Sequence, residues 1–210
     1  MKDTAPGQPT IVFDIGNVLI RWDPRNLFRK TFAGDDAAME EFLATACSHD
    51  WLLQCDAGDI STNVASRIAD FPRYREQLTY FDTRWLETLD GMIEENVALF
   101  ARLKAQGRKV YGITNYSRDK FAQSQSLHPF YGWFDGLIVS GREGLVKPDP
   151  RIYALLFDRY GLDPANTLFV DDSEKNIRAA RAAGMDVIHC PIGFDLPAEF
   201  ARRGLLADAG

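Results

Sequence analysis

The sequence predicts an α/β protein in which a Rossmann-like parallel sheet forms the core and a helical cap domain is inserted after the first strand. Two observations support this prediction. From residue 92 onward, short apolar runs typical of strands alternate with segments of helical period, whereas residues 22–88 carry helical periodicity without a strand pattern. Strands that alternate with helices build a parallel sheet through right-handed crossovers. We therefore expect residues 1–20 and 89–210 to form the core and residues 21–88 to form the cap.

The core begins with the apolar stretch Thr10–Phe13, which runs into Asp14 and then a glycine two residues later. This pattern is typical of a buried strand followed by a sharp turn. Further along, Pro150 starts a helix and Gly184 ends another. The later pattern predicts strands at residues 109–113, 134–139, 167–170 and 186–189, and helices at residues 93–106, 117–127, 151–160 and 173–183.

The expected cap begins near Pro24, which suits the first turn of a helix that Asp23 can cap, so a helix is predicted over residues 24–32. The segment Ser48–Asp59 interrupts the helical periodicity with a high density of ring, amide and acid side chains. No regular helix is predicted there. Apolar residues at helical spacing predict the remaining cap helices within residues 39–46, 61–69 and 74–89.

Composition limits the classes of partner. The net charge is −6 and no basic run is present, which argues against nucleic acid as the main partner. The three cysteines are odd in number and lack metal-ligand spacing, so we expect reduced thiols that fill the core. The start of the chain lacks the apolar region of a signal peptide, and nowhere do about 18 uninterrupted apolar residues occur. We therefore expect a soluble, cytoplasmic protein with no membrane segment.

Polar side chains follow four of the predicted strands. Each of them has a structural explanation, since a threonine or an acid pair can cap a helix and a lysine can be a solvated loop charge. However, the carboxyl ends of parallel strands meet at one edge. Three carboxylates there repel one another unless a cation such as Mg²⁺ lies between them, and a lysine and a hydroxyl beside it complete a pocket for a phosphate. The residues are Asp14, Thr114 with Asn115, Lys147, and Asp171 with Asp172.

In this order and spacing, these segments resemble the motifs of the haloacid dehalogenase (HAD) superfamily of hydrolases that carry a helical cap after the first strand. The resemblance covers about residues 10–190, and the Asp-x-Gly-Asn pattern is similar to the branch that includes sugar-phosphate phosphatases. The matching segments are Phe13–Val18, Ile113–Asn115, Val146–Pro148 and Val170–Ser173 with Asn176.

The resemblance implies a role for each motif residue. Asp14 corresponds to the nucleophile that forms an aspartyl-phosphate, and Lys147 to the lysine that neutralises charge. Thr114 and Asn115 correspond to the pair that binds the phosphoryl group, with the Thr114 hydroxyl holding a phosphoryl oxygen as charge redistributes. Mg²⁺ is implied as the cofactor. Its ligands would be Asp14, the backbone carbonyl of Gly16, and one or both of Asp171 and Asp172.

One position departs from the family pattern. Most phosphatases of the superfamily carry a second aspartate two residues after the nucleophile as a general acid and base, and Gly16 stands there in this chain. General acid–base catalysis commonly contributes about 10²–10⁴-fold. A slow or selective enzyme would be consistent with its loss, as would an acid that the cap supplies through Asp23 or Asp56.

Three alternatives remain beside the phosphatase. A metal-independent 2-haloacid dehalogenase shares the nucleophile and the lysine, but the pair Asp171 and Asp172 argues against it. A phosphomutase needs the acid that is absent at Gly16. A protein that binds a phosphorylated ligand with little turnover stays open, although Asp14, Lys147 and both later acids are all retained.

Substrate choice is expected to lie in the cap, because the motif residues can recognise only the phosphoryl group. Trp51 and Asp56 are predicted to bind the leaving group, since an aromatic ring beside hydrogen-bonding groups suits a sugar. The structural alternative is that Trp51 is an ordinary residue of the cap core and that Asp59 caps the helix starting near Ser61. The sequence thus favours a small phosphorylated metabolite, a sugar phosphate, as the substrate.

Overall fold

The computed structural model describes residues 8–206, and its core is a five-stranded sheet in the order β5-β4-β1-β6-β7. Every neighbouring pair in this sheet is parallel, which confirms the predicted α/β class. The strands are β1 (Thr10–Phe13), β4 (Val110–Thr114), β5 (Gly136–Val139), β6 (Thr167–Asp171) and β7 (Asp186–His189). Their bounds agree with the predicted strands to within two residues.

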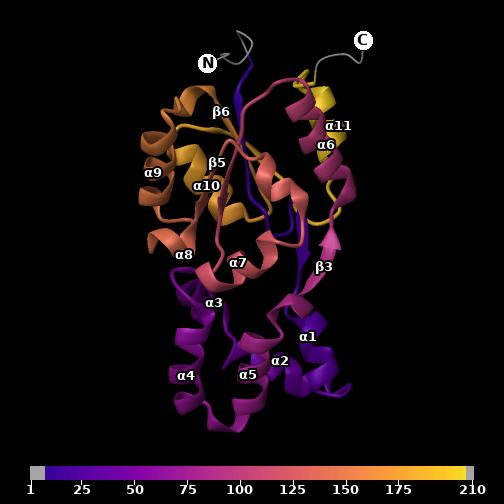
Figure 1. Ribbon diagram of the computed structural model, residues 1–210, viewed down its shortest axis with the longest axis vertical. Helices are drawn as coiled ribbons and strands as arrows, with labels where there is room; N and C mark the ends of the chain where they lie inside the picture. The colour runs from indigo at the N-terminus through magenta and orange to yellow at the C-terminus, as the bar shows by residue number, and fades with distance from the viewer. Residues whose placement is uncertain (1–7, 207–210) are drawn as a thin grey trace.

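The central strand β1 is buried on both faces of the sheet. Val12 packs into one hydrophobic cluster with Phe169, whereas Phe13 packs into the other with Phe100 and Phe200. Successive residues of a strand point to opposite faces, so an unbroken apolar run is what a strand covered on both sides requires. Figure 1 shows α9 (Pro150–Tyr160) and α10 (Glu174–Ala182) on one side of the sheet and α6 (Glu94–Ala105) and α11 (Leu196–Arg202) on the other.

Shorter elements complete the core. Figure 1 shows that α7 and α8 lie at the end of the sheet that faces the inserted helices of residues 25–88. None of the helices in residues 8–206 is both long and apolar enough to cross a membrane. The remaining core elements are α7 (Arg118–Gln125), α8 (Ser140–Glu143), and the 3₁₀ turns η3 (Pro129–Trp133) and η4 (Pro164–Asn166).

The inserted helices pack around an aromatic centre of their own. Phe28 lies between Phe42, with ring centroids 4.6 Å apart, and Phe81, with centroids 6.0 Å apart. Figure 1 shows these helices together at one end of the molecule, beyond the sheet. They are α1 (Arg25–Thr31), α2 (Asp36–Ala44), α3 (His49–Asp56), α4 (Ile60–Asp70), α5 (Arg75–Thr83), and the 3₁₀ turns η1 (Pro72–Tyr74) and η2 (Trp85–Thr88).

A two-stranded antiparallel ribbon, which the sequence did not predict, joins the inserted helices to the core. It pairs β2 (Ile20–Trp22) with β3 (Leu89–Met92). The helix predicted over residues 74–89 accordingly ends at Thr83, and its last residue belongs to the ribbon. Both strands are short, and β3 contains Asp-Gly, a turn signal, with Gly91 at φ 73°. Periodicity over so few residues could not reveal them.

The segment around residues 48–59 is largely helical, contrary to prediction, because α3 spans His49–Asp56. The Ser48 hydroxyl accepts a hydrogen bond from the backbone N–H of Trp51, which caps the helix. Trp51 and Cys55, four residues apart, supply its buried stripe. A stripe of only two residues was too narrow to register as helical periodicity. All three cysteines are buried and unpaired, as expected.

Hydrogen bonds between α4 and α7 fasten the inserted helices to the core. The Asp119 carboxylate on α7 accepts hydrogen bonds from the backbone N–H groups of Ile60 and Ser61, at 3.1 and 3.3 Å. Asp59, predicted to cap α4, occupies the N-cap position without a side-chain capping bond and pairs instead with Arg118. The helix start is therefore satisfied by a carboxylate from the core, which ties the two parts together.

Candidate active site

Asp14 follows β1 directly and lies at the carboxyl edge of the sheet. Its backbone N–H donates to the carbonyl of Val170 at 2.9 Å, which extends the pairing of β1 with β6 to this residue. Its carboxylate accepts the backbone N–H of Ile15 at 2.7 Å. The turn that follows needs Asn17 at φ 55°, a left-handed conformation that asparagine tolerates better than most residues. Strand and turn together fix the direction of the carboxylate.

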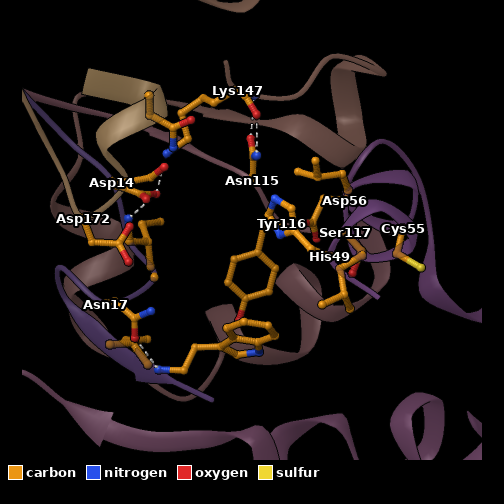
Figure 2. A pocket seen from close by; sticks show the side chains of 18 of the residues that line it. Asp14, Asn17, His49, Cys55, Asp56, Asn115, Tyr116, Ser117, Lys147 and Asp172 are labelled. Carbon is orange, nitrogen blue, oxygen red and sulfur yellow. Dashed lines mark hydrogen bonds and ion pairs between the residues drawn. The ribbon is translucent and has the colours of Figure 1, made fainter. Parts of the chain in front are cut away.

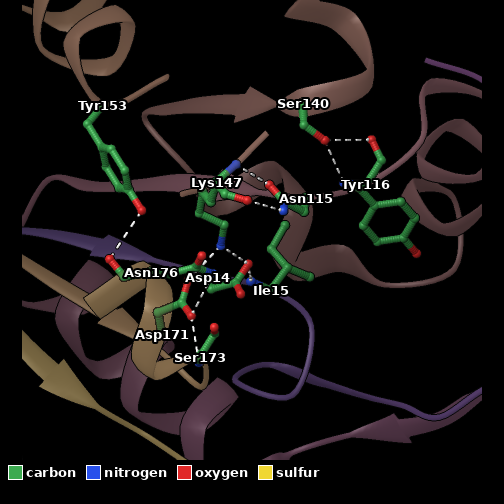
Figure 3. A network of polar contacts seen from close by, with 10 residues as sticks. All are labelled: Asp14, Ile15, Asn115, Tyr116, Ser140, Lys147, Tyr153, Asp171, Ser173 and Asn176. Atoms are coloured by element: carbon green, nitrogen blue, oxygen red, sulfur yellow. Dashed lines mark hydrogen bonds and ion pairs between the residues drawn. The ribbon is translucent and has the colours of Figure 1, made fainter. Parts of the chain in front are cut away.

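Lys147 bridges two carboxylates inside the protein, and its side chain is 0% exposed. Its Nζ lies 2.9 Å from Asp14 Oδ1 and 2.7 Å from Asp171 Oδ2. Figure 3 shows how Asn115 holds the lysine backbone: its amide donates to the Lys147 carbonyl at 2.9 Å and accepts the Lys147 N–H at 2.8 Å. Asn115 therefore positions the lysine, and its predicted contact with a phosphoryl group stays a prediction.

Asp171 and Asp172 occupy different surroundings although they are adjacent. Asp171 is fully buried and accepts hydrogen bonds from the backbone N–H of Ser173 at 2.7 Å and from the Asn176 amide at 3.0 and 3.1 Å, besides its pair with Lys147. Asp172 lines the cavity described below, and the Asn17 side chain hydrogen-bonds to it. Asp171 is thus hydrogen-bonded to groups of the protein, whereas Asp172 faces the cavity.

The three acids form a cluster that fits a divalent cation. Carboxylate oxygens of Asp14, Asp171 and Asp172 lie within 4.8 Å of one another. Burial raises the pKa of Asp14, Lys147 opposes the rise, and the other two acids add to it. Burial and Asp171 also raise the pKa of Asp172. Burial opposes the charge on Lys147, but Asp14 and Asp171 hold its pKa above the usual range. Three acids against one lysine leave negative charge that Mg²⁺ would compensate through the oxygen ligands it prefers.

A cavity of about 410 Å³ opens between this cluster and the inserted helices. Its polar end holds Asp14, Asn17, Lys147 and Asp172, which Figure 2 shows grouped along one side. The rest of the wall is mainly apolar, and α3, α4, α5, η2 and the ribbon supply most of it. The apolar lining includes Ile20, Trp22, Leu52, Leu53, Cys55, Ile60, Phe81, Trp85, Leu89 and Tyr116.

Asp56, at the end of α3, brings a carboxyl group to the wall across from Asp14 (Figure 2). Its backbone carbonyl accepts the Ser140 hydroxyl at 2.6 Å. The backbone N–H of Ser117 donates to its carboxyl. Burial raises the pKa of Asp56 to about 7, against the opposing effects of Ser117 and Lys147. This acid therefore titrates near neutral pH.

Two predicted site residues lie elsewhere. Trp51 does not line the cavity: it is 4% exposed and packs in the cap core, 5.7 Å from the Phe81 ring and 5.7 Å from the Arg67 guanidinium carbon. This corrects the prediction that Trp51 covers the leaving group, because its position on α3 turns it inward. Thr114 is buried at the end of β4 and also does not line the cavity, so its contact with a phosphoryl group stays a prediction. Gly16 does line it.

Several cavity residues were not predicted. Asn17 immediately follows the Asp-x-Gly motif, and this adjacency was the signal that could have found it. Tyr116 and Ser117 extend the Thr114-Asn115 strand end by two residues. The apolar wall gave no comparable signal, because the sequence around Leu53 does not distinguish an apolar residue that lines a cavity from one that fills a core.

The sequence matches the family of haloacid dehalogenase-like hydrolases over residues 9–184. Sesquiterpene phosphatase astK of Aspergillus oryzae is 30% identical over 183 residues, which cover 85% of this chain and 87% of that protein. Acyl-CoA dehydrogenase family member 10 of Mus musculus is 24% identical over 194 residues, which cover 85% of this chain and only 17% of that protein. This chain belongs to the haloacid dehalogenase-like hydrolase family.

Solved structures share the fold. A HAD family enzyme of Bacteroides thetaiotaomicron, determined in complex with magnesium and inorganic phosphate, has a TM-score of 0.73. The match covers 92% of this chain and 100% of that one at 22% sequence identity. At this identity the likeness establishes the arrangement of sheet and helices. The chain is thus a hydrolase with the predicted fold, and the function of its site follows from its own residues.

Proposed function

We propose that this protein is a Mg²⁺-dependent phosphatase that hydrolyses the phosphate monoester of a small, apolar alcohol through an aspartyl-phosphate on Asp14. The observation that supports it is the cavity, which joins the cluster of Asp14, Lys147 and Asp172 to a mainly apolar wall. One end suits a phosphoryl group and the other an apolar leaving group. The fold-wide resemblance to phosphatases of the family agrees with this reaction.

The metal would be held by Asp14, the backbone carbonyl of Gly16, and the acid pair. Asp172 is the better direct ligand of that pair, since Asp171 is already occupied by the Ser173 N–H, the Asn176 amide and Lys147. When bound, Mg²⁺ offsets the repulsion between the carboxylate nucleophile and the anionic phosphate.

In the proposed reaction, Asp14 acts as the nucleophile and Lys147 binds the reacting groups. Asp14 attacks the phosphorus in line, the phosphorus–oxygen bond to the alcohol breaks, and a water later hydrolyses the resulting aspartyl-phosphate. Lys147 aims the Asp14 carboxylate through its 2.9 Å contact, and its charge opposes the rise in the Asp14 pKa that burial causes. An ammonium has three N–H donors, so one remains for a phosphoryl oxygen after Asp14 and Asp171 are bound. Such a preorganised donor commonly contributes a hundredfold or more in rate.

The cavity wall supports an apolar alcohol over the sugar that the sequence favoured. A buried sugar hydroxyl without a partner costs about 1–3 kcal/mol, and the inserted helices offer only His49, Asp50 and Asp56 as polar side chains on the wall. A hydrocarbon instead gains roughly 25 cal/mol for each Å² of apolar surface that it buries. The similarity to a sesquiterpene phosphatase, whose name indicates a phosphorylated sesquiterpene as substrate, supports the same class.

A comparison of two phosphate monoesters tests this proposal. We expect purified protein with Mg²⁺ to release inorganic phosphate from decyl phosphate with a kcat/KM at least tenfold above that for glucose 6-phosphate. EDTA should abolish the release, as should Asp14→Asn, which removes the nucleophile and a metal ligand while preserving shape. Metal-independent chloride release from 2-chloropropionate would instead identify a dehalogenase. Equal or greater activity on glucose 6-phosphate would refute the apolar substrate.

A pair of leucine variants locates the preference in the cavity. Leu53 lines the cavity, whereas Leu86 lies in η2, is 37% exposed and does not line it. Leu53→Ala should lower kcat/KM for decyl phosphate by about 10–200-fold, the range expected for lost apolar contact in a specificity pocket. Leu86→Ala should change it less than twofold. Similar losses in both variants would show that the wall does not contact the alcohol.

A further inference from the structure

The proposed reaction lacks a proton donor at its usual place. An alkoxide is a poor leaving group, so the departing oxygen of an aliphatic alcohol needs a proton as its bond to phosphorus breaks. Gly16, two residues after Asp14, has no side chain to provide it. A Cβ added at Gly16 would meet no atom within 4 Å, so no neighbouring side chain fills this space in its stead. The donor must come from another wall of the cavity.

We propose that Asp56 is the general acid that protonates the leaving alcohol, an inference that rests on the proposed phosphatase function. Asp56 lies on the cavity wall, across from Asp14 (Figure 2). A phosphate on Asp14 would direct its leaving group away from that carboxylate, because nucleophile and leaving group are in line. The leaving oxygen therefore points toward the wall that contains Asp56.

The main chain around Asp56 is fixed by hydrogen bonds to the core. The Ser140 hydroxyl donates to the Asp56 carbonyl at 2.6 Å, and the Arg118 N–H donates to the Gly58 carbonyl at 2.7 Å. The Ser117 N–H holds the carboxyl itself. A proton donor must be held in a narrow range of positions to act, and these three bonds supply that restraint from both sides of the residue.

The surroundings of Asp56 keep a large part of it protonated at neutral pH. Burial raises its pKa to about 7, while the positive charge of Lys147 and the Ser117 N–H limit the rise. A general acid works best when its pKa lies near the working pH. The other titratable groups that face the same cavity are His49, Asp50, Cys55, Tyr116, Lys175, Asp14 and Asp172.

The proton balance closes over two steps. As Asp14 bonds to phosphorus, the phosphorus–oxygen bond to the alcohol breaks and its electron pair takes the proton of the Asp56 carboxyl, which releases a neutral alcohol. The Asp56 carboxylate then accepts a proton from the water that attacks the aspartyl-phosphate. Inorganic phosphate leaves, and both Asp14 and Asp56 return to their initial states.

Asp23, the other acid that the cap could supply, is placed differently. Its carboxylate accepts the backbone N–H of Arg25, the first residue of α1, at 2.9 Å. It lines a second cavity and does not line the cavity of Asp14. Asp23→Asn is therefore the matched control for Asp56→Asn.

The test compares two leaving groups. Decyl phosphate releases an alkoxide that needs a proton, whereas p-nitrophenyl phosphate releases an anion that is stable at neutral pH and needs none. For Asp56→Asn we expect kcat/KM to fall about 10²–10⁴-fold on decyl phosphate and less than tenfold on p-nitrophenyl phosphate. Asp23→Asn should leave both values within twofold. Asparagine can still accept the Ser117 N–H, and an unchanged thermal midpoint would confirm that the variant is folded.

The pH profile gives an independent readout. Because the protonated acid is the active form, the ratio of kcat/KM for decyl phosphate to that for p-nitrophenyl phosphate should fall about tenfold per pH unit above pH 7 in the wild type, and should not vary with pH in Asp56→Asn. Equal losses on both substrates would overturn the acid role and leave Asp56 a positioning residue. Absence of hydrolysis by the wild type would instead refute the phosphatase proposal itself.

Discussion

Replacing Lys147 with methionine should destabilise the protein strongly in the absence of metal. Methionine fills a similar volume but removes the charge that lies 2.9 Å from Asp14 and 2.7 Å from Asp171. Removing one partner of a buried ion pair typically costs about 3–5 kcal/mol, because the remaining charge is left unpaired. Domains commonly have 5–15 kcal/mol of stability in total, so the loss would be a large share of it.

Urea unfolding in EDTA measures this loss, and Lys104→Met is the control. Lys104 also pairs with an aspartate, Asp135, but the two side chains are 27% and 31% exposed. Exposed pairs contribute about 0–1 kcal/mol. A loss for Lys147→Met within about 1 kcal/mol of that for Lys104→Met would refute the view that Lys147 is the main counter-charge of the acid cluster.

Acid and metal should each reduce the cost of Lys147→Met. The pKa of Asp14 already lies above its unfolded value, and loss of Lys147 raises it further. The unfolded chain then ionises first as pH rises, so the variant loses stability with rising pH and regains it on acidification. Mg²⁺ binds only the folded cluster and should restore part of the stability at pH 8. A deficit that is independent of both pH and Mg²⁺ would indicate lost packing instead of unpaired charge.

Two glycine substitutions test other parts of the structure. Gly141→Ala should lower the free energy of unfolding by about 1–3 kcal/mol. The added Cβ would lie 2.4 Å from the backbone nitrogen of Arg118 and 2.6 Å from the backbone oxygen of Gly58, and the hydrogen bond between these two atoms joins the inserted helices to the core. Gly132→Ala, whose Cβ would meet no atom within 4 Å, is the control, and equal urea midpoints would contradict the close contact. Gly16→Asp in the Asp56→Asn background should recover at least tenfold of the lost kcat/KM on decyl phosphate, since the open space at Gly16 admits a side chain beside Asp14. No recovery would indicate that a missing proton donor is not what limits that variant.

The core was largely predictable because each of its strands combines two local signals. β6 is an apolar run that stops at an acid, and β7 follows α10, whose end at Ala182 is followed by Gly184 at a positive φ. The apolar runs are present because a parallel sheet that is covered on both faces needs continuously apolar strands. The predicted meeting of Asp14, Lys147 and Asp171 is confirmed by contacts below 3 Å.

The inserted helices were less predictable, because polar residues interrupt the apolar periodicity by which a helix is recognised. α3 carries only Trp51 and Cys55 as fully buried residues, so its helical period was masked by the polar residues between them. The ribbon of β2 and β3 depends on pairing between residues about 70 positions apart, as in Ile20 with Met92, which no local pattern reports. Whether Trp51 faces the substrate or the cap core likewise depends on the tertiary neighbour Phe81.

The apolar character of the substrate cavity could not be read from the sequence for a related reason. Leu53 lies in the segment of residues 48–59 that shows no helical periodicity, and Trp85 lies within a predicted helix; only the three-dimensional structure shows that both border an open space. The shape and polarity of the cavity thus depend on how the inserted helices pack over the core, whereas the motif residues follow from four strand ends.

The hydrogen bonds that hold the turn from α3 to α4 on the core have a consequence for the order of events. The Arg118 N–H, the Ser140 hydroxyl and the Asp119 carboxylate grip one short stretch of cap backbone, residues 56–61. Asp56 and part of the apolar wall belong to that same stretch. Any movement that lifts this stretch from the core to admit a phosphate monoester would also carry Asp56 and Ile60 away from the rest of the cavity wall. In the proposed mechanism the proton donor is therefore in place only when the stretch contacts the core, so the substrate must bind before the catalytic arrangement is complete.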